Sequence, residues 1–239
     1  MAVNFSGGKD SLAVCYLLRE AGLLDRLTIY HNDTGDLLPE VREVVAHVEA
    51  FATRFVRVQG DVLGWIAANG LPSDLVPFGA HEVGRTVGQG PPVASRYDCC
   101  YANLMRPLWE RVRADGNTLV IRGTRKGDFP RLPVASGQTM EGCEFLHPIE
   151  DWSADDVFAY LRRVGAPICR VYEEGPQSPE CARCTAWMNV GTGRYLKRHH
   201  PALFHDYTAR LTALMGSLAP VLETYRREVA EVLANDTAA

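Results

Sequence analysis

The stretch that decides the fold is Ser6-Gly7-Gly8-Lys9-Asp10-Ser11. It follows the apolar segment Met1 to Phe5 and precedes Leu12 to Ala21, where apolar residues recur at helical spacing. The pattern predicts a strand, a tight turn and a helix. Paired glycines let the backbone amides point inward, while the helix N-terminus and Lys9 add positive charge, so the turn suits a phosphate. A turn capped by Ser6 and Asp10 without a ligand is the alternative.

The same order of strand, turn and helix recurs along the chain. Leu27 to Tyr30 predicts a second strand, followed by polar residues 31–35 and by a helix over Pro39 to Phe51. Further strands are predicted over Phe55 to Val58 and Thr118 to Ile121. Alternating strands and helices indicate a mostly parallel sheet covered on both faces, with ligands at the carboxyl ends of its strands. We therefore expect an α/β protein with a doubly wound sheet.

The remaining segments complete the expected organisation. Residues 70–98 are rich in Gly and Pro without periodicity, which predicts a long loop. Ser153 to Val164 has the N-cap and acidic first turn of a helix. Leu203 to Leu233 shows two amphipathic helical patterns divided near Gly216 to Pro220. The expected domains are a nucleotide-binding domain over residues 1–200 and a C-terminal helical extension over residues 201–239.

Composition narrows the class of protein. The chain has 239 residues, of which 46% are hydrophobic and 23% charged, as is typical of a globular domain. Its net charge of −4 excludes a uniform basic coat for nucleic acid, although a local basic channel is compatible with it. No apolar run approaches the roughly 18 residues of a membrane span, and the N-terminus has no signal-peptide pattern. We expect a soluble cytoplasmic protein without a membrane partner.

The chain contains seven cysteines. An odd number without a secretion signal argues for metal binding or thiol chemistry rather than for a disulfide framework. Cys99 and Cys100 are adjacent, and Cys181 and Cys184 form a Cys-x-x-Cys pair. Four thiolates suit a structural zinc or an iron–sulfur cluster, and buried small residues are the alternative. The others, interpreted as buried or incidental thiols, are Cys15, Cys143 and Cys169.

These motifs carry a family resemblance. The hexapeptide at Ser6 is similar to the Ser-Gly-Gly-x-Asp-Ser signature of PP-loop ATP pyrophosphatases, and the two cysteine pairs resemble the ligand set of the 4Fe-4S cluster in adenylyl-sulfate reductases. Asp33-Thr34-Gly35 resembles the Asp-Thr-Gly segment of these reductases, which lies near their nucleotide. Gly123-Thr124-Arg125-Lys126 resembles their Gly-x-Arg motif, which lies near the phosphates. The chain is identified as a member of the phosphoadenylyl-sulfate/adenylyl-sulfate reductase-like superfamily, with the adenine nucleotide alpha hydrolase-like fold.

The resemblance implies a set of site residues. Lys9 would hold the phosphates, Asp10 would help to bind Mg2+, and Arg125 would neutralise charge on the alpha phosphate. The substrate nucleotide would be ATP or adenylyl sulfate. The nucleotide-binding residues would be Ser6, Gly7, Gly8, Lys9, Asp10, Ser11, Asp33, Thr34, Gly35, Gly123 and Arg125. The 4Fe-4S cluster would be held by Cys99, Cys100, Cys181 and Cys184.

One departure decides the expected activity. The assimilatory reductases carry a catalytic cysteine in a Glu-Cys-Gly-x-His tail, whereas no cysteine follows Cys184 here. We therefore first expect an enzyme that cleaves ATP to AMP and pyrophosphate, activating a small-molecule or nucleic-acid acceptor for sulfur transfer. A cysteine desulfurase is a possible sulfur donor. The alternatives are a sulfite-forming reductase whose nucleophile is Cys143, Cys169 or a thiol of another chain, and a non-catalytic nucleotide-binding iron–sulfur protein.

Overall fold

The computed structural model describes residues 1–75, 93–128, 134–174, 181–186 and 190–236. Their contacts group the chain into two compact units, each built from two stretches of sequence. The first unit comprises Met1–Asp61 and Ala102–Ala182. The second unit comprises Val62–Tyr101 and Arg183–Ala239. The expected boundary at residue 200 stays a prediction. The contacts divide the chain differently and group residues 183–200 with the C-terminal helix.

A six-stranded sheet forms the centre of the first unit, in the order β3-β2-β1-β6-β8-β7. Neighbouring strands are parallel except for β7 and β8, which are antiparallel. The sheet therefore confirms the expected mostly parallel α/β fold. Its strands are β1 (Ala2–Phe5), β2 (Thr28–Asp33), β3 (Phe55–Gln59), β6 (Leu119–Ile121), β7 (Thr139–Met140) and β8 (Cys143–Leu146).

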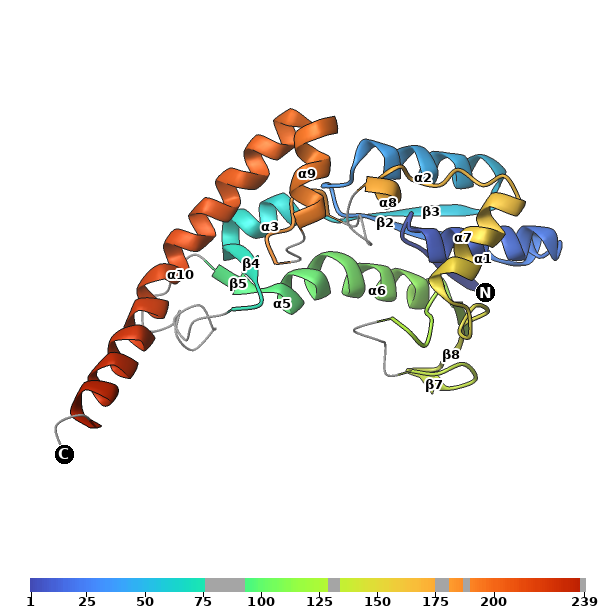
Figure 1. Cartoon of the computed structure of the whole chain (residues 1–239). Helices are drawn as coiled ribbons and strands as arrows, with labels where there is room; N and C mark the ends of the chain where they lie inside the picture. The colour runs from blue at the N-terminus through green and yellow to red at the C-terminus, as the bar shows by residue number, and fades with distance from the viewer. Residues whose placement is uncertain (76–92, 129–133, 175–180, 187–189, 237–239) are drawn as a thin grey trace. The chain divides into compact units, whose positions relative to one another are not determined.

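Helices cover both faces of this sheet. Figure 1 shows α2 and α6 on opposite faces, and α7 packs against α1. The helix predicted over Pro39 to Phe51 is found with those bounds, and Ser153 caps α7 through a capping box with Asp156. The helical segments are α1 (Lys9–Glu20), η1 (Leu24–Arg26), α2 (Pro39–Phe51), the π-helical η3 (Tyr101–Met105), α6 (Arg106–Ala114), α7 (Ala154–Arg163) and α8 (Val171–Glu174).

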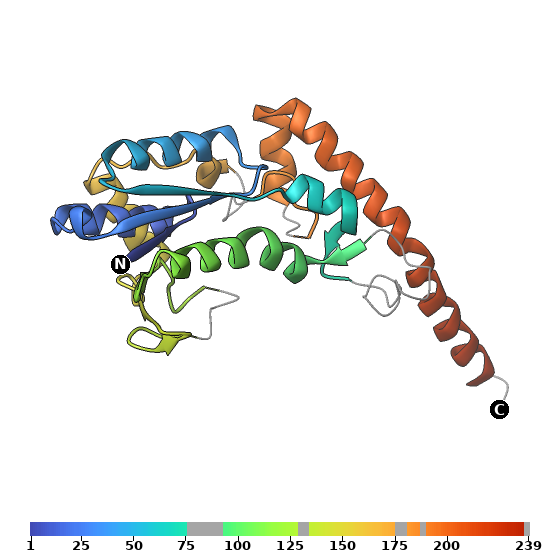
Figure 2. The same ribbon diagram turned by 180° about the vertical axis from the view of Figure 1, so that it is seen from behind.

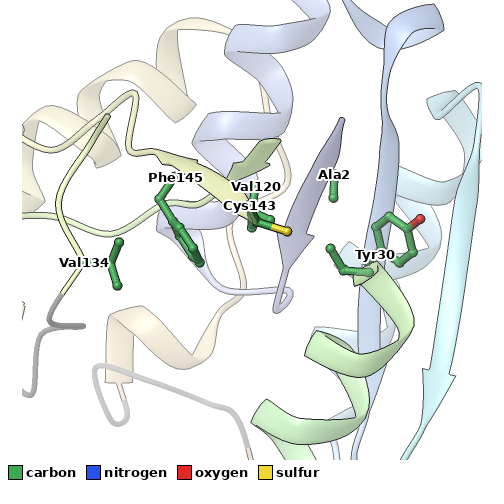
Figure 3. Packing of buried hydrophobic residues seen from close by; sticks show 7 residues of the cluster. Ala2, Tyr30, Val120, Val134, Cys143 and Phe145 are labelled. Carbon is green, nitrogen blue, oxygen red and sulfur yellow. The ribbon is translucent and has the colours of Figure 1, made fainter. Parts of the chain in front are cut away.

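The core on the α6 face is drawn in Figure 3. Buried residues of β2, β6 and β8, among them Tyr30, Val120 and Phe145, pack there with Val112 of α6. The hydroxyl group at the polar end of Tyr30 donates a hydrogen bond to Asp115 Oδ2 at 2.9 Å. Side chains alternate along a strand, so the next residues in each strand face the opposite layer of helices. Because helices cover both faces of the sheet, side chains on both faces of a strand are apolar, and the strands appear in the sequence as short apolar runs.

The second unit combines helices with a parallel pair of short strands. Its small core contains Val93 and Leu214, with Leu71 and Leu218 packed against them. Thr185 Oγ1 also donates to the Pro72 carbonyl at 2.7 Å. The elements are α3 (Val62–Asn69), β4 (Leu71–Ser73), β5 (Val93–Ser95), α5 (Arg96–Cys100), α9 (Val190–His199) and α10 (Pro201–Asp236).

Two expectations about this unit are corrected. The loop predicted over residues 70–98 contains β4, β5 and part of α5, while residues 76–92 lie outside the described part of the chain. The strands pair with each other and pack on α10, which no local pattern reveals. The two expected C-terminal helices form one helix, α10, with Pro220 inside it (Figure 2). Among the described helices, none has the length and apolar character needed to cross a membrane.

Candidate nucleotide-binding site

The phosphate loop, residues 6–11, connects β1 to α1 in the first unit, as the sequence predicted. Ser6 N–H donates to Ser11 Oγ at 3.2 Å, and Ser11 Oγ donates to the Gly8 carbonyl at 3.0 Å. Gly7 has a φ of +86°, and a Cβ there would lie 2.7 Å from Val41 Cγ1. The loop therefore requires glycine at this position. Its shape presents the N-terminus of α1 at the carboxyl edge of the sheet.

Two cations converge on one carboxylate in this loop. Lys9 Nζ lies 2.6 Å from Asp10 Oδ2, and Arg125 Nε lies 2.9 Å from Asp10 Oδ1. The side chains of Lys9 and Arg125 are only 9% and 12% exposed. Three of the predicted site residues are thus brought together from two distant segments. Because the cations are largely shielded from water, their attraction for an anion is stronger than on an open surface.

Asp128 completes the charged network, although no sequence motif predicts it. Its Oδ1 lies 2.7 Å from Arg125 Nη2, and its Oδ2 accepts from the Arg125 N–H at 2.8 Å. The network contains two cations and two carboxylates, so its charges balance. A ligand anion would take over contacts that Asp10 and Asp128 now make with Lys9 and Arg125. The Gly-x-Arg motif alone gave no sign that an acid two positions beyond Lys126 would hold the arginine.

Gly123 brings the second motif directly onto the phosphate loop. A Cβ at this position would lie 2.6 to 2.7 Å from backbone atoms of Asp10 and Ser11, closer than real Cβ atoms come. Only a residue without a side chain permits this approach. The packing therefore brings Gly123 and Arg125 to the loop, while their place near the phosphates of a nucleotide stays a prediction.

Aromatic residues also line the loop, and they were not predicted. Lys9 N–H donates to Tyr172 Oη of α8 at 3.0 Å. Lys9 Nζ lies 5.6 Å from the centroid of the Tyr172 ring and 5.9 Å from that of Phe158 in α7. Both distances are typical of cation–π contacts. Tyr172 lies far from the loop in sequence, and no local spacing could have identified it.

The Asp33-Thr34-Gly35 segment forms a turn at the end of β2. Asp33 Oδ1 accepts from the Gly35 N–H at 2.9 Å, and Gly35 has a φ of +83°. Because β1 and β2 are parallel neighbours, this turn and the phosphate loop lie at the same edge of the sheet. One expectation is corrected, since β2 extends through Asp33 rather than ending at Tyr30. The polar residues stay in the strand because β3 pairs with them as far as Asp33 and Gln59.

The four paired cysteines are distributed over both units. Cys99 and Cys100 end α5 and Cys184 follows the unit boundary, all in the second unit, whereas Cys181 is in the first. Cys181 Sγ donates to Thr34 Oγ1 at 3.7 Å, which ties it to the turn after β2. Within the described part of the chain, no group of three or more His, Cys, Asp or Glu side chains is arranged to hold a metal ion. The ligand set therefore stays a prediction.

The other three cysteines are buried, as the sequence interpretation expected. Burial raises the pKa of the Cys15 thiol far above its usual range and raises that of Cys169 to about 11. Cys143 Sγ donates to the Asn117 carbonyl at 3.1 Å inside the core. Attack on a substrate needs an accessible thiolate. None of the three thiols meets that requirement in this structure.

A glycine-rich loop between a parallel strand and a helix, with lysine and arginine converging on it, is the arrangement of α/β proteins of the PP-loop class. Residues 1–187 match the phosphoadenosine phosphosulfate reductase domain, and the chain belongs to that family of enzymes.

Named relatives agree with this assignment. The chain is 26% identical to adenosine 5'-phosphosulfate reductase of Allochromatium vinosum over 192 residues, covering 77% of this chain and 67% of that protein. Over 184 residues it is also 26% identical to the reductase of that name from Neisseria meningitidis, covering 76% and 66%. The chain thus spans about two thirds of the length of these relatives. Their names match the reductase alternative better than the ATP-cleaving activity expected first.

A solved structure shows the same fold. The crystal structure of phosphoadenylyl-sulfate (PAPS) reductase from Candida auris, a phosphate complex, superimposes with a TM-score of 0.53. The sequences are 15% identical, and the match covers 75% of this chain and 80% of that chain. At this identity the likeness concerns the fold alone.

Proposed function

We propose that the protein binds adenosine 5'-phosphosulfate at the phosphate loop and reduces its sulfate group to sulfite. The observation that carries the proposal is the convergence of Lys9 and Arg125 on Asp10 at the N-terminus of α1, in a chain of the phosphosulfate reductase family. The ligand's phosphate and sulfate are linked by an anhydride and both carry negative charge. Two shielded cations and a helix N-terminus provide complementary charge.

Binding divides between two loops at the edge of the sheet. Lys9 and Arg125 exchange contacts with Asp10 for contacts with the anionic groups, and both side chains are largely shielded from water. The turn at Asp33 to Gly35 follows the strand that pairs with β1, and it is assigned to the nucleoside. Arg125 then faces the phosphate, where charge develops as AMP leaves.

The reaction needs two thiols, which supply the two electrons that reduce the sulfate group to sulfite. A thiolate attacks the sulfate sulfur, a sulfur–sulfur bond forms, and the bond from that sulfur to the phosphate oxygen breaks as AMP leaves. A second thiolate attacks the sulfur of the first thiol, forming a disulfide and releasing sulfite. Cys15, Cys143 and Cys169 are buried, so we assign both thiols to a separate dithiol protein. Its two thiols are oxidised to a disulfide while the sulfate group is reduced.

A 4Fe-4S cluster is part of the proposal. The donor chemistry fits, since such clusters are bound by cysteine thiolates, and Cys99, Cys100, Cys181 and Cys184 would hold it. A bound cluster would supply redox capacity close to its cysteine ligands. Metal analysis of the anaerobically purified protein tests this assignment. About four irons per chain are expected, and one zinc per chain without iron would overturn it.

ATP cleavage to AMP and pyrophosphate is the second candidate. The burial of Cys15, Cys143 and Cys169 favours it, because this reaction needs no protein thiol as nucleophile. Asp10 would then help to bind Mg2+ with the polyphosphate, and the activated acceptor would be a small molecule or a nucleic acid.

The two candidate functions predict different preferred ligands, so equilibrium binding measurements distinguish them. We expect calorimetry with adenosine 5'-phosphosulfate, AMP and ATP to show that the phosphosulfate binds more tightly than AMP without added Mg2+. The reason is that its second anionic group reaches Lys9 and Arg125. Binding of the phosphosulfate no tighter than that of AMP would contradict the proposal, and tight binding of ATP alone with Mg2+ would favour the second candidate.

A further inference from the structure

Both neighbours of Cys184 in the chain are tied to other parts of the second unit. On one side, Thr185 Oγ1 donates a hydrogen bond to the Pro72 carbonyl of β4 at 2.7 Å. On the other side, Arg183 forms an ion pair with Asp206 of α10. The two partners lie 113 and 23 residues away in the sequence. Cys184 is therefore held on both sides by tertiary contacts.

Thr185 is a buried polar residue whose hydrogen bond has no substitute in water. Its side chain is 1% exposed, and Pro72 is buried as well. Buried polar groups in proteins are almost always paired, and 2.7 Å is a typical length for a hydrogen bond between two oxygens. Removal of the hydroxyl would leave the Pro72 carbonyl without this partner. The bond therefore fixes the backbone next to Cys184.

The strand that accepts this hydrogen bond also leads to the other cysteine pair. β4 pairs in parallel with β5, and Pro72 lies opposite Ala94 in this pairing. α5 follows β5 directly, and the side chain of Ser95 caps its first turn. The helix ends with Cys99 and Cys100. The cysteine pair and Thr185 are thus attached to the same two strands.

The contact of Asp206 with Arg183 belongs to the same part of the second unit. Asp206 Oδ2 also lies 3.1 Å from Arg210 Nη2, and the two arginine side chains are each 17% exposed. Cations shielded from water in this way are normally paired with a carboxylate. α10 packs on the strand pair, since Leu214 and Leu71 belong to one apolar core (Figure 1). The anchors on both sides of Cys184 therefore belong to one packed group of elements.

We propose that Thr185 and Asp206 are positioning residues for Cys184, which they hold in the part of the chain that carries Cys99 and Cys100. The inference rests on the proposed function for the presence of the 4Fe-4S cluster. Such a cluster needs its thiolates at fixed separations. Neither positioning residue would bind the cluster, because each acts through the backbone beside Cys184.

The first test measures the release of iron to a ferrous-iron chelator after anaerobic reconstitution with ferrous iron and sulfide. Thr185→Val removes the hydroxyl but keeps the shape of the side chain, and it should release iron about tenfold faster than the wild type. Thr185→Ser restores the hydroxyl and should release iron at the wild-type rate. Thr208→Val is the matched control, since the Thr208 hydroxyl donates to the Phe204 carbonyl at 2.9 Å within α10. It should also keep the wild-type rate.

Asp206→Asn tests the other side of Cys184 and serves if Thr185→Val does not fold. The amide keeps the shape of the side chain but loses the charge that pairs with Arg183, so iron release should be about fivefold faster. Glu223→Gln is its matched control, because Glu223 pairs with Arg226 at an exposed position of α10. Equal rates for these two variants would contradict the role of Asp206.

Cross-linking of the metal-free protein separates this inference from the cluster assignment. Dibromobimane bridges two neighbouring thiols, and wild-type protein should form a bridge from Cys184 to Cys99 or Cys100. The yield, measured by mass analysis of peptides, should fall severalfold in Thr185→Val and stay unchanged in Thr208→Val. Wild-type iron release or a wild-type bridge yield in Thr185→Val would overturn the inference. Absence of iron from the wild-type protein would instead refute the cluster assignment, while the bridge yields would still decide the role of Thr185.

Discussion

The guanidinium of Arg125 lies 2.9 Å from the carboxylate of Asp10, joining the two motifs of the site across the first unit. Gly123 makes this contact possible by packing its bare Cα against the backbone of the phosphate loop. Since Lys9 holds the other oxygen of Asp10, the carboxylate occupies the space between two cations. An anion entering this site would replace the Asp10 carboxylate between the two cations.

Lys9→Ala should weaken binding of adenosine 5'-phosphosulfate by about 2 kcal/mol, or roughly thirtyfold. The reason is that a shielded ammonium is lost from the loop. Lys197→Ala is the matched control because Lys197 is an exposed lysine of α9 in the second unit. Calorimetry measures both variants, and iron content should stay at the wild-type value in each. If Lys9→Ala and the wild type bound adenosine 5'-phosphosulfate with equal affinity, the loop would not be part of the binding site.

Asp128→Asn should tighten binding of the same ligand by roughly fivefold, about 1 kcal/mol. The substitution removes one negative charge from a network whose charges balance, while the amide oxygen can still accept from the Arg125 backbone. Asp151→Asn is the control, since Asp151 pairs with Lys126 at an exposed position. Titrations at low and high salt should show the gain shrinking as salt rises. Weaker binding by Asp128→Asn would instead identify Asp128 as a residue that positions Arg125 for the ligand.

Gly123→Ala should destabilise the first unit by about 1 to 3 kcal/mol and impair nucleotide binding, because the added Cβ overlaps the loop backbone. Gly127→Ala in the same segment meets nothing within 4 Å and should change stability little. Urea unfolding monitored by circular dichroism gives both values. A Gly123→Ala protein as stable as Gly127→Ala would contradict the described packing.

The double variant Cys143→Ala with Cys169→Ala should retain the activity of the wild-type enzyme. Both thiols are buried, and the raised pKa of Cys169, about 11, keeps that thiol protonated at neutral pH. Alkylation of native Cys169 should accordingly be slow at pH 7 and accelerate as the pH rises toward 11, whereas unfolded protein should react at all its cysteines. Mass measurement follows both reactions. A sulfonated Cys143 or Cys169 after mixing with substrate would assign the nucleophile to this chain.

The parts of the site that follow from local sequence were predictable. The hexapeptide at residues 6–11 encodes its own turn, and the apolar runs around it encode the strand and helix. The turn of residues 33–35 was likewise placed at the correct edge of the sheet. These features depend on neighbours in the chain, so a single sequence contains the information.

Most of the missed features depend on contacts between distant segments. Tyr172 reaches the loop through tertiary packing. Asp128 is the exception, since it contacts Arg125 three residues away at a spacing that no motif fixes. The strands β4 and β5 exist because Leu71 and Val93 pack with residues of α10. Packing does not explain why α10 continues through Pro220, because Leu214 and Leu218 pack before the proline and residues 222–234 are exposed.

The reductase activity is tested by the products formed from two nucleotides, offered in parallel to the anaerobically purified protein. One reaction contains adenosine 5'-phosphosulfate with a reduced dithiol protein of the thioredoxin class, and the other contains ATP with Mg2+. We expect AMP and sulfite in equal amounts from the first reaction and no pyrophosphate from the second. Pyrophosphate and AMP from ATP, with the phosphosulfate left intact, would contradict the proposed reductase activity.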